Sequence, residues 1–146
     1  MKSLFIFNGL FSLVAGTLIY LLFRTSALNI FNWLEILNID FINSSWRIFG
    51  RIYYNIFPDW FLFSLPDGLW IFSYTSIMFA FWDFKFDFQT FFWINILPII
   101  AVFSEIGQFL KVVNGTFDFC DLLFYLSGFL LPFIILTKKL KIYEKN

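Results

Sequence analysis

Four long apolar stretches, separated by shorter polar ones, dominate the pattern of hydrophobic and polar positions along the chain. They cover about residues 4–23, 65–82, 91–110 and 119–137. A helix needs about 20 apolar residues to cross the hydrocarbon core of a bilayer. The pattern therefore predicts an all-α fold: a polytopic membrane helix bundle with four transmembrane helices, forming one integral membrane domain over residues 1–146. We expect the first stretch to be a retained span, because it is longer than an ordinary signal-peptide core.

The long segment between the first and second stretches, residues 24–64, is mixed in polarity and rich in aromatic residues. Its tryptophans and tyrosines stand among charged side chains: Trp33, Trp46, Arg47, Arg51, Tyr53, Tyr54, Asp59 and Trp60. Aromatic residues beside charges are typical of the membrane–water boundary. We therefore expect one or two short helices lying in that interface, such as residues 46–57.

Composition agrees with this picture and excludes several classes of function. The chain is 60% hydrophobic and 14% charged, whereas soluble domains are about half apolar and a quarter charged. The formal net charge is zero and the charges are scattered, so no basic patch indicates a nucleic-acid partner. There is no histidine, which rules out Ser-His-Asp and Cys-His catalytic arrangements within this chain. The single Cys120 allows neither an internal disulfide nor a multi-cysteine zinc site.

The distribution of basic residues predicts the orientation. Four spans place both termini on one side, together with six lysines: Lys2, Lys85, Lys138, Lys139, Lys141 and Lys145. The opposite side holds four basic residues: Arg24, Arg47, Arg51 and Lys111. Basic residues are enriched in cytoplasmic loops. The sequence thus predicts a multi-pass protein of the bacterial cytoplasmic (inner) membrane with both termini in the cytoplasm.

This topology brings several acidic and amide side chains to the outer side of the membrane. They stand at the start of the second span, the end of the third and the start of the fourth: Asp67, Glu105, Gln108, Asp118 and Asp121. Ionisable groups near lipid are costly and by default mark functional sites. We expect these groups, with the 24–64 segment that carries Arg47 and Arg51, to share one outward-opening depression.

Spacing supports this convergence. Glu105 and Gln108 are three residues apart and share a helix face, and Asp118 and Asp121 have the same relation. Tyr125 continues the second stripe by four residues. The short connector between the third and fourth spans predicts that they are antiparallel neighbours, which would bring the two pairs together.

Two glycines are consistent with a tight turn and close helix packing in this region. Asn114-Gly115 in the connector is a turn signal. Gly128 lies farther along the stripe of Asp121 and would let a neighbouring helix approach closely.

A purely structural role for these residues is the alternative. Asp67, Asp118 and Asp121 each stand near a helix N-terminus, where an acidic side chain caps the helix and complements its dipole. Glu105 lies near a helix C-terminus and gains nothing from the dipole. A structural reading of Glu105 therefore needs a basic partner, for which Arg47 and Arg51 are the candidates.

One segment of the chain resembles a known family. Glu105-Ile-Gly-Gln108, followed by Gly115-Thr-Phe-Asp118-Phe-Cys-Asp121 and then Gly128, resembles the VanZ-like family of small bacterial membrane proteins. That family has a Glu-x-x-Gln pair at the end of one helix and an Asp-x-x-Asp step at the start of the next. This chain departs from the pattern at Thr116, where an arginine is common, and at Tyr125, where asparagine is usual. The resemblance implies a role in the bacterial cell envelope.

Three functions remain open from the sequence. The first is binding of a membrane lipid or lipid-linked envelope precursor by the outward-facing cluster, either directly or through a divalent cation such as magnesium or calcium, which prefer oxygen ligands. In this reading Asp118, Asp121 and Glu105 are the metal ligands, and Gln108 orients the ligand. The second is a metal-assisted hydrolase or transferase for lipid-linked substrates, with Glu105 as ligand or base. The third is a structural or assembly subunit with a membrane-protein partner.

Overall fold

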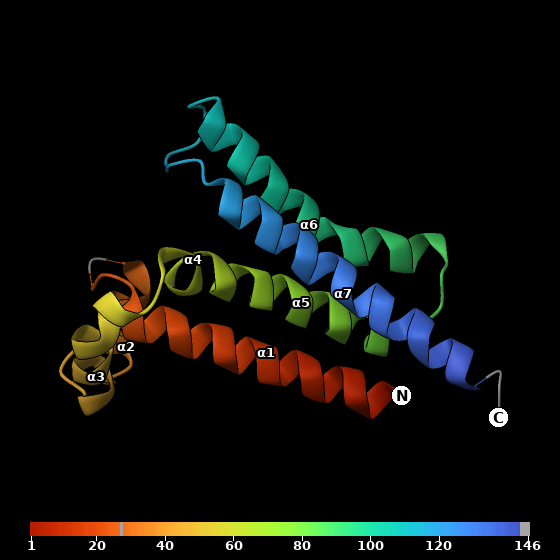
Figure 1. Cartoon of the computed structure of the whole chain (residues 1–146), viewed down its shortest axis with the longest axis horizontal. Helices are drawn as coiled ribbons and strands as arrows, with labels where there is room; N and C mark the ends of the chain where they lie inside the picture. Colours follow the sequence, from red (N-terminus) through yellow and green to blue (C-terminus); the bar gives the residue numbers. More distant parts are fainter. Residues whose placement is uncertain (27, 144–146) are drawn as a thin grey trace.

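The computed structural model describes residues 1–26 and 28–143, with side chains described as far as residue 138. All regular structure in these residues is helical, comprising seven α-helices and one 3-10 helix. The four long helices are α1 (Lys2–Phe23), α5 (Ser64–Phe81), α6 (Phe88–Phe109) and α7 (Phe119–Tyr143). They form the elongated bundle seen in Figure 1. The predicted all-α architecture is therefore confirmed.

Three of the long helices are long and apolar enough to cross a membrane: Lys2–Phe23, Phe88–Phe109 and the Phe119–Lys138 part of α7. The prediction of four such helices was wrong. The exception is α5, which has 18 residues and carries Asp67 together with several hydroxyl side chains. The chain thus has three apolar candidate spans, as expected of a multi-pass membrane protein.

The position of α5 explains why its sequence is less apolar. It lies between α1 and α7 and packs extensively against both, while α6 contacts it more lightly. Figure 1 shows α5 running antiparallel to α1 and parallel to α7. Four of its hydroxyl residues are buried in these contacts: Ser64, Ser73, Thr75 and Ser76. Because neighbouring helices cover them, these polar groups face protein rather than lipid.

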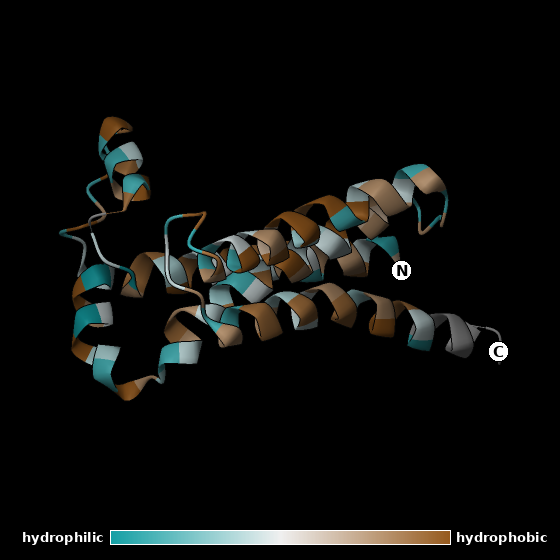
Figure 2. Cartoon of the chain, turned by 90° about the horizontal axis from the view of Figure 1, so that it is seen from above, coloured by the Kyte–Doolittle hydropathy of each residue, from teal (hydrophilic) through white to brown (hydrophobic). Residues whose placement is uncertain are grey.

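The outer surface of the long helices is strongly apolar. Large phenylalanines project from α1 and α6 with about two thirds or more of their surface exposed: Phe7, Phe11, Phe88, Phe91 and Phe103. Figure 2 shows the apolar positions along the long helices and more polar ones near their ends. Monomeric soluble proteins rarely expose apolar patches of this extent, so this surface is suited to contact with lipid tails.

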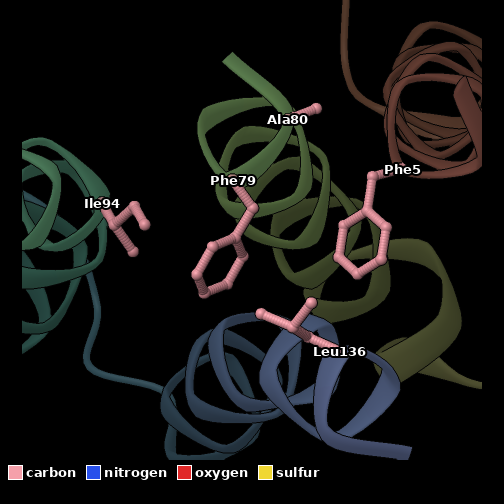
Figure 3. Packing of buried hydrophobic residues seen from close by; sticks show 5 residues of the cluster. All are labelled: Phe5, Phe79, Ala80, Ile94 and Leu136. Atoms are coloured by element: carbon pink, nitrogen blue, oxygen red, sulfur yellow. The ribbon is translucent and has the colours of Figure 1, made fainter. Parts of the chain in front are cut away.

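A compact apolar core joins all four long helices near the start of α1. Phe5, Phe79, Ala80, Ile94 and Leu136 are each at most 3% exposed and pack together, as Figure 3 shows. The rings of Phe5 and Phe79 meet edge to face with centroids 6.3 Å apart, a favoured geometry for aromatic pairs. This core fixes one end of the bundle.

That end also carries an ion pair between α1 and the loop after α5. The Lys2 ammonium contacts the Asp83 carboxylate at 2.6 Å, and this hydrogen bond holds the pKa of Asp83 below its usual value. The end of α7 lies at the same end of the bundle (Figure 1). Lys2 and the loop that carries Lys85 therefore lie at the same end of the bundle, whereas Lys145 lies outside the described residues. We call the opposite end of the bundle the far end.

Short helices occupy the segment between α1 and α5 at the far end. They are α2 (Asn29–Ile36), α3 (Ser45–Tyr53), the 3-10 helix η1 (Tyr54–Ile56) and α4 (Asp59–Leu62). The Ser44 hydroxyl caps α3 by accepting a hydrogen bond from the Arg47 N–H. Figure 2 shows the small helices at one end of the bundle, turned across the direction of the long helices. Together α3 and η1 cover the helix predicted for residues 46–57, to within a residue or two at each end.

α3 packs on the end of α1 through a glycine. A Cβ atom added to Gly50 would lie inside van der Waals contact of the Leu22 carbonyl oxygen and 3.0 Å from the Leu22 carbonyl carbon. Only glycine lets the two backbones approach this closely. This contact positions the basic residues of α3 against the C-terminal end of α1.

Candidate functional site at the far end of the bundle

The far end gathers acidic residues from three long helices. Asp67 lies near the start of α5, Glu105 near the end of α6, and Asp121 in the first turn of α7. These three carboxylates lie close enough for their charges to interact. The Tyr125 hydroxyl donates a hydrogen bond of 3.5 Å to Asp67 Oδ2, which links α7 to α5. We call Asp67, Glu105, Asp121 and Tyr125 the far-end acidic cluster.

Glu105 is the most deeply buried acid of the cluster. Its side chain is 3% exposed, and its Oε2 atom accepts a hydrogen bond of 3.2 Å from the backbone N–H of Asp118. The carboxylate thus satisfies one of the amide groups that lead into α7, where a negative charge is favourable. Glu105 is therefore enclosed, in contrast to the open depression expected from the sequence, and it joins the end of α6 to the start of α7.

Asp118 caps the N-terminus of α7, as the structural alternative predicted. Its Oδ1 atom accepts a hydrogen bond of 2.8 Å from the Cys120 N–H. Side-chain bonds of this kind satisfy amides that have no partner within the helix. Asp118 therefore helps to start α7; its charge acts on Glu105, but no described side-chain hydrogen bond joins it to the far-end acidic cluster.

Asp121 is different, because one of its oxygen atoms has no partner. Its Oδ1 atom is buried and accepts no hydrogen bond from any described group. Unsatisfied buried acceptors are uncommon and call for an explanation, such as a ligand or an ordered water. Of the acids predicted from the sequence, Asp121 is the one with a buried oxygen atom that has no hydrogen-bond partner among the described groups.

Gln108 packs against the turn that connects α6 and α7. The turn signal at Asn114-Gly115 is confirmed, since Gly115 has a φ of +140°. A Cβ atom at Gly115 would lie 2.7 Å from the Gln108 Cδ atom, so the side chain of Gln108 covers the glycine. The structure places Gln108 one turn beyond Glu105 but gives it no hydrogen bond to the cluster.

The two arginines proposed as partners of Glu105 lie elsewhere. Arg47 donates from Nη1 to the Leu21 carbonyl at 2.5 Å and from Nη2 to the Arg24 carbonyl. Arg51, one turn farther along α3, forms no described salt bridge. The hypothesis that Arg47 or Arg51 holds Glu105 was therefore wrong, because the bend after α1 brings α3 onto the end of α1 instead.

Arg24 is the basic residue that sequence reasoning missed. It interacts electrostatically with Asp67, and its Nη2 atom donates to the Phe63 carbonyl at 3.3 Å. Its guanidinium also lies over the Tyr20 and Phe63 rings, 5.3 and 4.8 Å from their centroids. An arginine directly after an apolar run resembles an ordinary interfacial anchor, so the sequence carries no signal for this role.

The predicted metal site is not assembled. Among the residues that the structure describes, no group of three or more acidic, cysteine or histidine side chains is arranged to hold a metal ion. One oxygen atom each of Glu105 and Asp118 accepts a hydrogen bond from a backbone amide. Asp118, Asp121 and Glu105 thus do not form the three-residue ligand set expected from their spacing.

Comparison with known proteins adds no relative: no protein-family model, curated protein or solved structure matches the chain.

Proposed function

We propose that this chain is a bacterial cytoplasmic-membrane protein of the cell envelope, similar to the VanZ-like proteins, that binds a polar headgroup at the far-end acidic cluster. The ligand is a membrane lipid or a lipid-linked envelope precursor. In this proposal α5 crosses the bilayer as a fourth helix inside the bundle, shielded by α1 and α7. Both termini then lie in the cytoplasm, and the far end faces outward.

The observation that carries the proposal is the buried Oδ1 atom of Asp121, which has no hydrogen-bond partner in the described part of the chain. It lies with Asp67 and Glu105 near the outer end of the helices, at headgroup depth in the proposed topology. Ionised carboxylates only accept hydrogen bonds, and Arg24 is the one cation found to act on Asp67. The cluster therefore favours headgroups that carry amine, hydroxyl or amide donors.

The first experiment compares the lipids retained by wild-type protein and by Asp121→Asn after gentle solubilisation, using native mass spectrometry. Asparagine keeps the shape of the side chain but removes its charge and one acceptor position. We expect a bound lipid or precursor on the wild type and a loss of roughly tenfold or more in its occupancy in the variant, as for removal of a charged hydrogen bond.

Asp59→Asn is the matched control, because Asp59 is exposed, lies in the first turn of α4 and loses the same charge. Its adducts should equal those of the wild type. Identical adducts on wild type and Asp121→Asn, with both proteins folded, would contradict headgroup binding at the cluster.

A structural or assembly role is the second candidate, and one observation favours it. The Glu105 carboxylate accepts a hydrogen bond from the Asp118 N–H, which is a structural role. If this is the main role of the acids, Glu105→Gln, Asp121→Asn and Asp67→Asn should each lower the yield of folded protein, and a stoichiometric membrane-protein partner should co-purify. A folded Asp121→Asn variant that has lost only its lipid excludes this reading for Asp121.

A further inference from the structure

A second polar site lies at the far end, apart from the acidic cluster. A cavity of about 300 Å³ opens where α3 and η1 meet the last turn of α1. Leu22 and Phe23 of α1 form its apolar side, and its polar lining comprises Arg47, Arg51, Tyr54 and Asn55. We call this cavity the arginine pocket. None of its lining residues is acidic.

The pocket is built around a fixed cation. Arg47 is 4% exposed, and its guanidinium is held by the Leu21 and Arg24 carbonyls and lies 4.7 Å from the centroid of the Phe31 ring. These contacts prevent the side chain from moving to another partner. Its Nε atom remains buried with no hydrogen-bond partner among the described groups. Because arginine stays protonated in proteins, Arg47 is a permanent positive charge in the pocket wall.

Arg51 adds a second, accessible positive charge. It follows Arg47 by four residues on α3, which places the two guanidinium groups on one face of the helix. Burial and the charge of Arg51 lower the pKa of Arg47, and like charges four residues apart on a helix repel each other. The one salt bridge within the described residues joins Lys2 and Asp83 at the opposite end. Within the described residues, no carboxylate therefore pairs with the two arginines, and Arg47 is met by carbonyl oxygens alone.

The remaining polar lining supplies donors suited to an anion. The Tyr54 hydroxyl and the Asn55 amide can both donate hydrogen bonds, and Arg51 offers the planar donor pair that matches two oxygen atoms of one phosphate. The pocket adjoins the end of an apolar span, where headgroups meet water. Other positions of α3 carry exposed apolar side chains, including Trp46, Phe49 and Ile52, as expected for a helix in the interface.

We propose that the arginine pocket binds a phosphate group, supplied either by the phosphodiester of an anionic lipid or by free phosphate. Arg51, Tyr54 and Asn55 donate hydrogen bonds to the phosphate oxygens, and Arg47 contributes its fixed charge. The bound anion relieves the repulsion between the two arginines. This site does not depend on the acidic cluster, since the two use different residues and ligands of opposite charge.

The test uses the full-length chain in an uncharged detergent, titrated separately with phosphatidylglycerol and with inorganic phosphate and followed by native mass spectrometry. We expect Arg51→Gln to weaken phosphate-group binding by roughly ten- to a hundredfold, the usual effect of losing a charge-assisted hydrogen-bond pair. Tyr54→Phe removes a hydroxyl only and should weaken binding by a smaller factor. Arg51 is exposed, so both variants should keep wild-type helix content and elution.

Lys111→Gln is the control for general attraction of anions, because Lys111 is an exposed cation at the same end of the bundle. It should bind both probes as the wild type does. Arg51-dependent binding of inorganic phosphate that competes with the lipid would identify free phosphate as a ligand, and Arg51-dependent binding of the lipid alone would identify the headgroup. The proposal is overturned if the wild type binds neither probe, if Arg51→Gln binds both normally, or if Lys111→Gln is impaired equally.

Discussion

Gly128→Ala is expected to destabilise the bundle by about 3 kcal/mol, the upper part of the usual range for overpacking. A Cβ atom at Gly128 would overlap the Gly68 carbonyl oxygen and lie 3.1 Å from both the Gly68 carbonyl carbon and the Phe72 nitrogen. All three atoms belong to the backbone of α5, so no side-chain rotation relieves the clash. The two parallel helices would have to separate along the contact that holds α7 to the centre of the bundle.

The measurement is the midpoint of unfolding of the purified protein in mixed detergent micelles, followed by circular dichroism. Gly107→Ala is the matched control, because it makes the same change inside α6 and its Cβ atom meets only the side chain of Val113. Val113 is 44% exposed and can turn away. We expect a large decrease in the midpoint for Gly128→Ala and a small change for Gly107→Ala. Equal midpoints for the two variants would contradict the close α5–α7 contact.

The role of Gly128 shows what the sequence could predict. A glycine on the polar stripe of the last span indicated a close helix neighbour. The structure identifies that neighbour as α5, whose Gly68 backbone lies against Gly128. A short connector predicts that two consecutive spans are neighbours. Which helix packs most closely depends on which helix faces fit together.

Long apolar composition correctly identified three candidate spans, and the prediction failed for α5, whose polar groups are buried against other helices. The runs in α1, α6 and α7 stand out by composition alone. The α5 segment is less apolar, and its hydroxyl groups are tolerated because α1 and α7 cover them. Burial of Thr75 and Ser76 at 0–1% exposure depends on those neighbours and cannot be read from the α5 sequence itself.

The same division applies to the candidate site. Topology correctly predicted that Asp67, Glu105 and Asp121 would lie at one end of the bundle. The partner of each acid was not predictable, because a carboxylate can be satisfied equally well by a backbone amide or by an arginine. Glu105 uses the Asp118 N–H, and Arg47 uses two carbonyl groups. Backbone groups carry no sequence signature, so sequence reasoning overestimates contacts between side chains.

Arg47→Met is the second substitution with a large expected effect, again about 3 kcal/mol of lost stability. Methionine retains an unbranched side chain of similar reach but has no donor, so the Leu21 and Arg24 carbonyls at the end of α1 lose their partner. Buried acceptors left without a hydrogen bond carry the full cost of their desolvation. The contact of the guanidinium with the Phe31 ring is also lost. Detachment of α3 from α1 is the expected structural consequence.

Limited proteolysis distinguishes this local detachment from global unfolding. In the Arg47→Met variant, cleavage should appear first between α2 and α4, while the long helices remain protected and the unfolding midpoint decreases. Arg51→Met removes the same charge from the same face of α3, but Arg51 is exposed and forms no described salt bridge, so its stability should change by about 0.5 kcal/mol or less. If both variants lose stability equally, stability depends on the positive charge of α3 and not on the hydrogen bonds from Arg47 to the end of α1. The structural role assigned to Arg47 would then be wrong. A greater loss of stability in Arg47→Met than in Arg51→Met would show that Arg47 holds α3 on α1, whereas Arg51 is free to bind an anion.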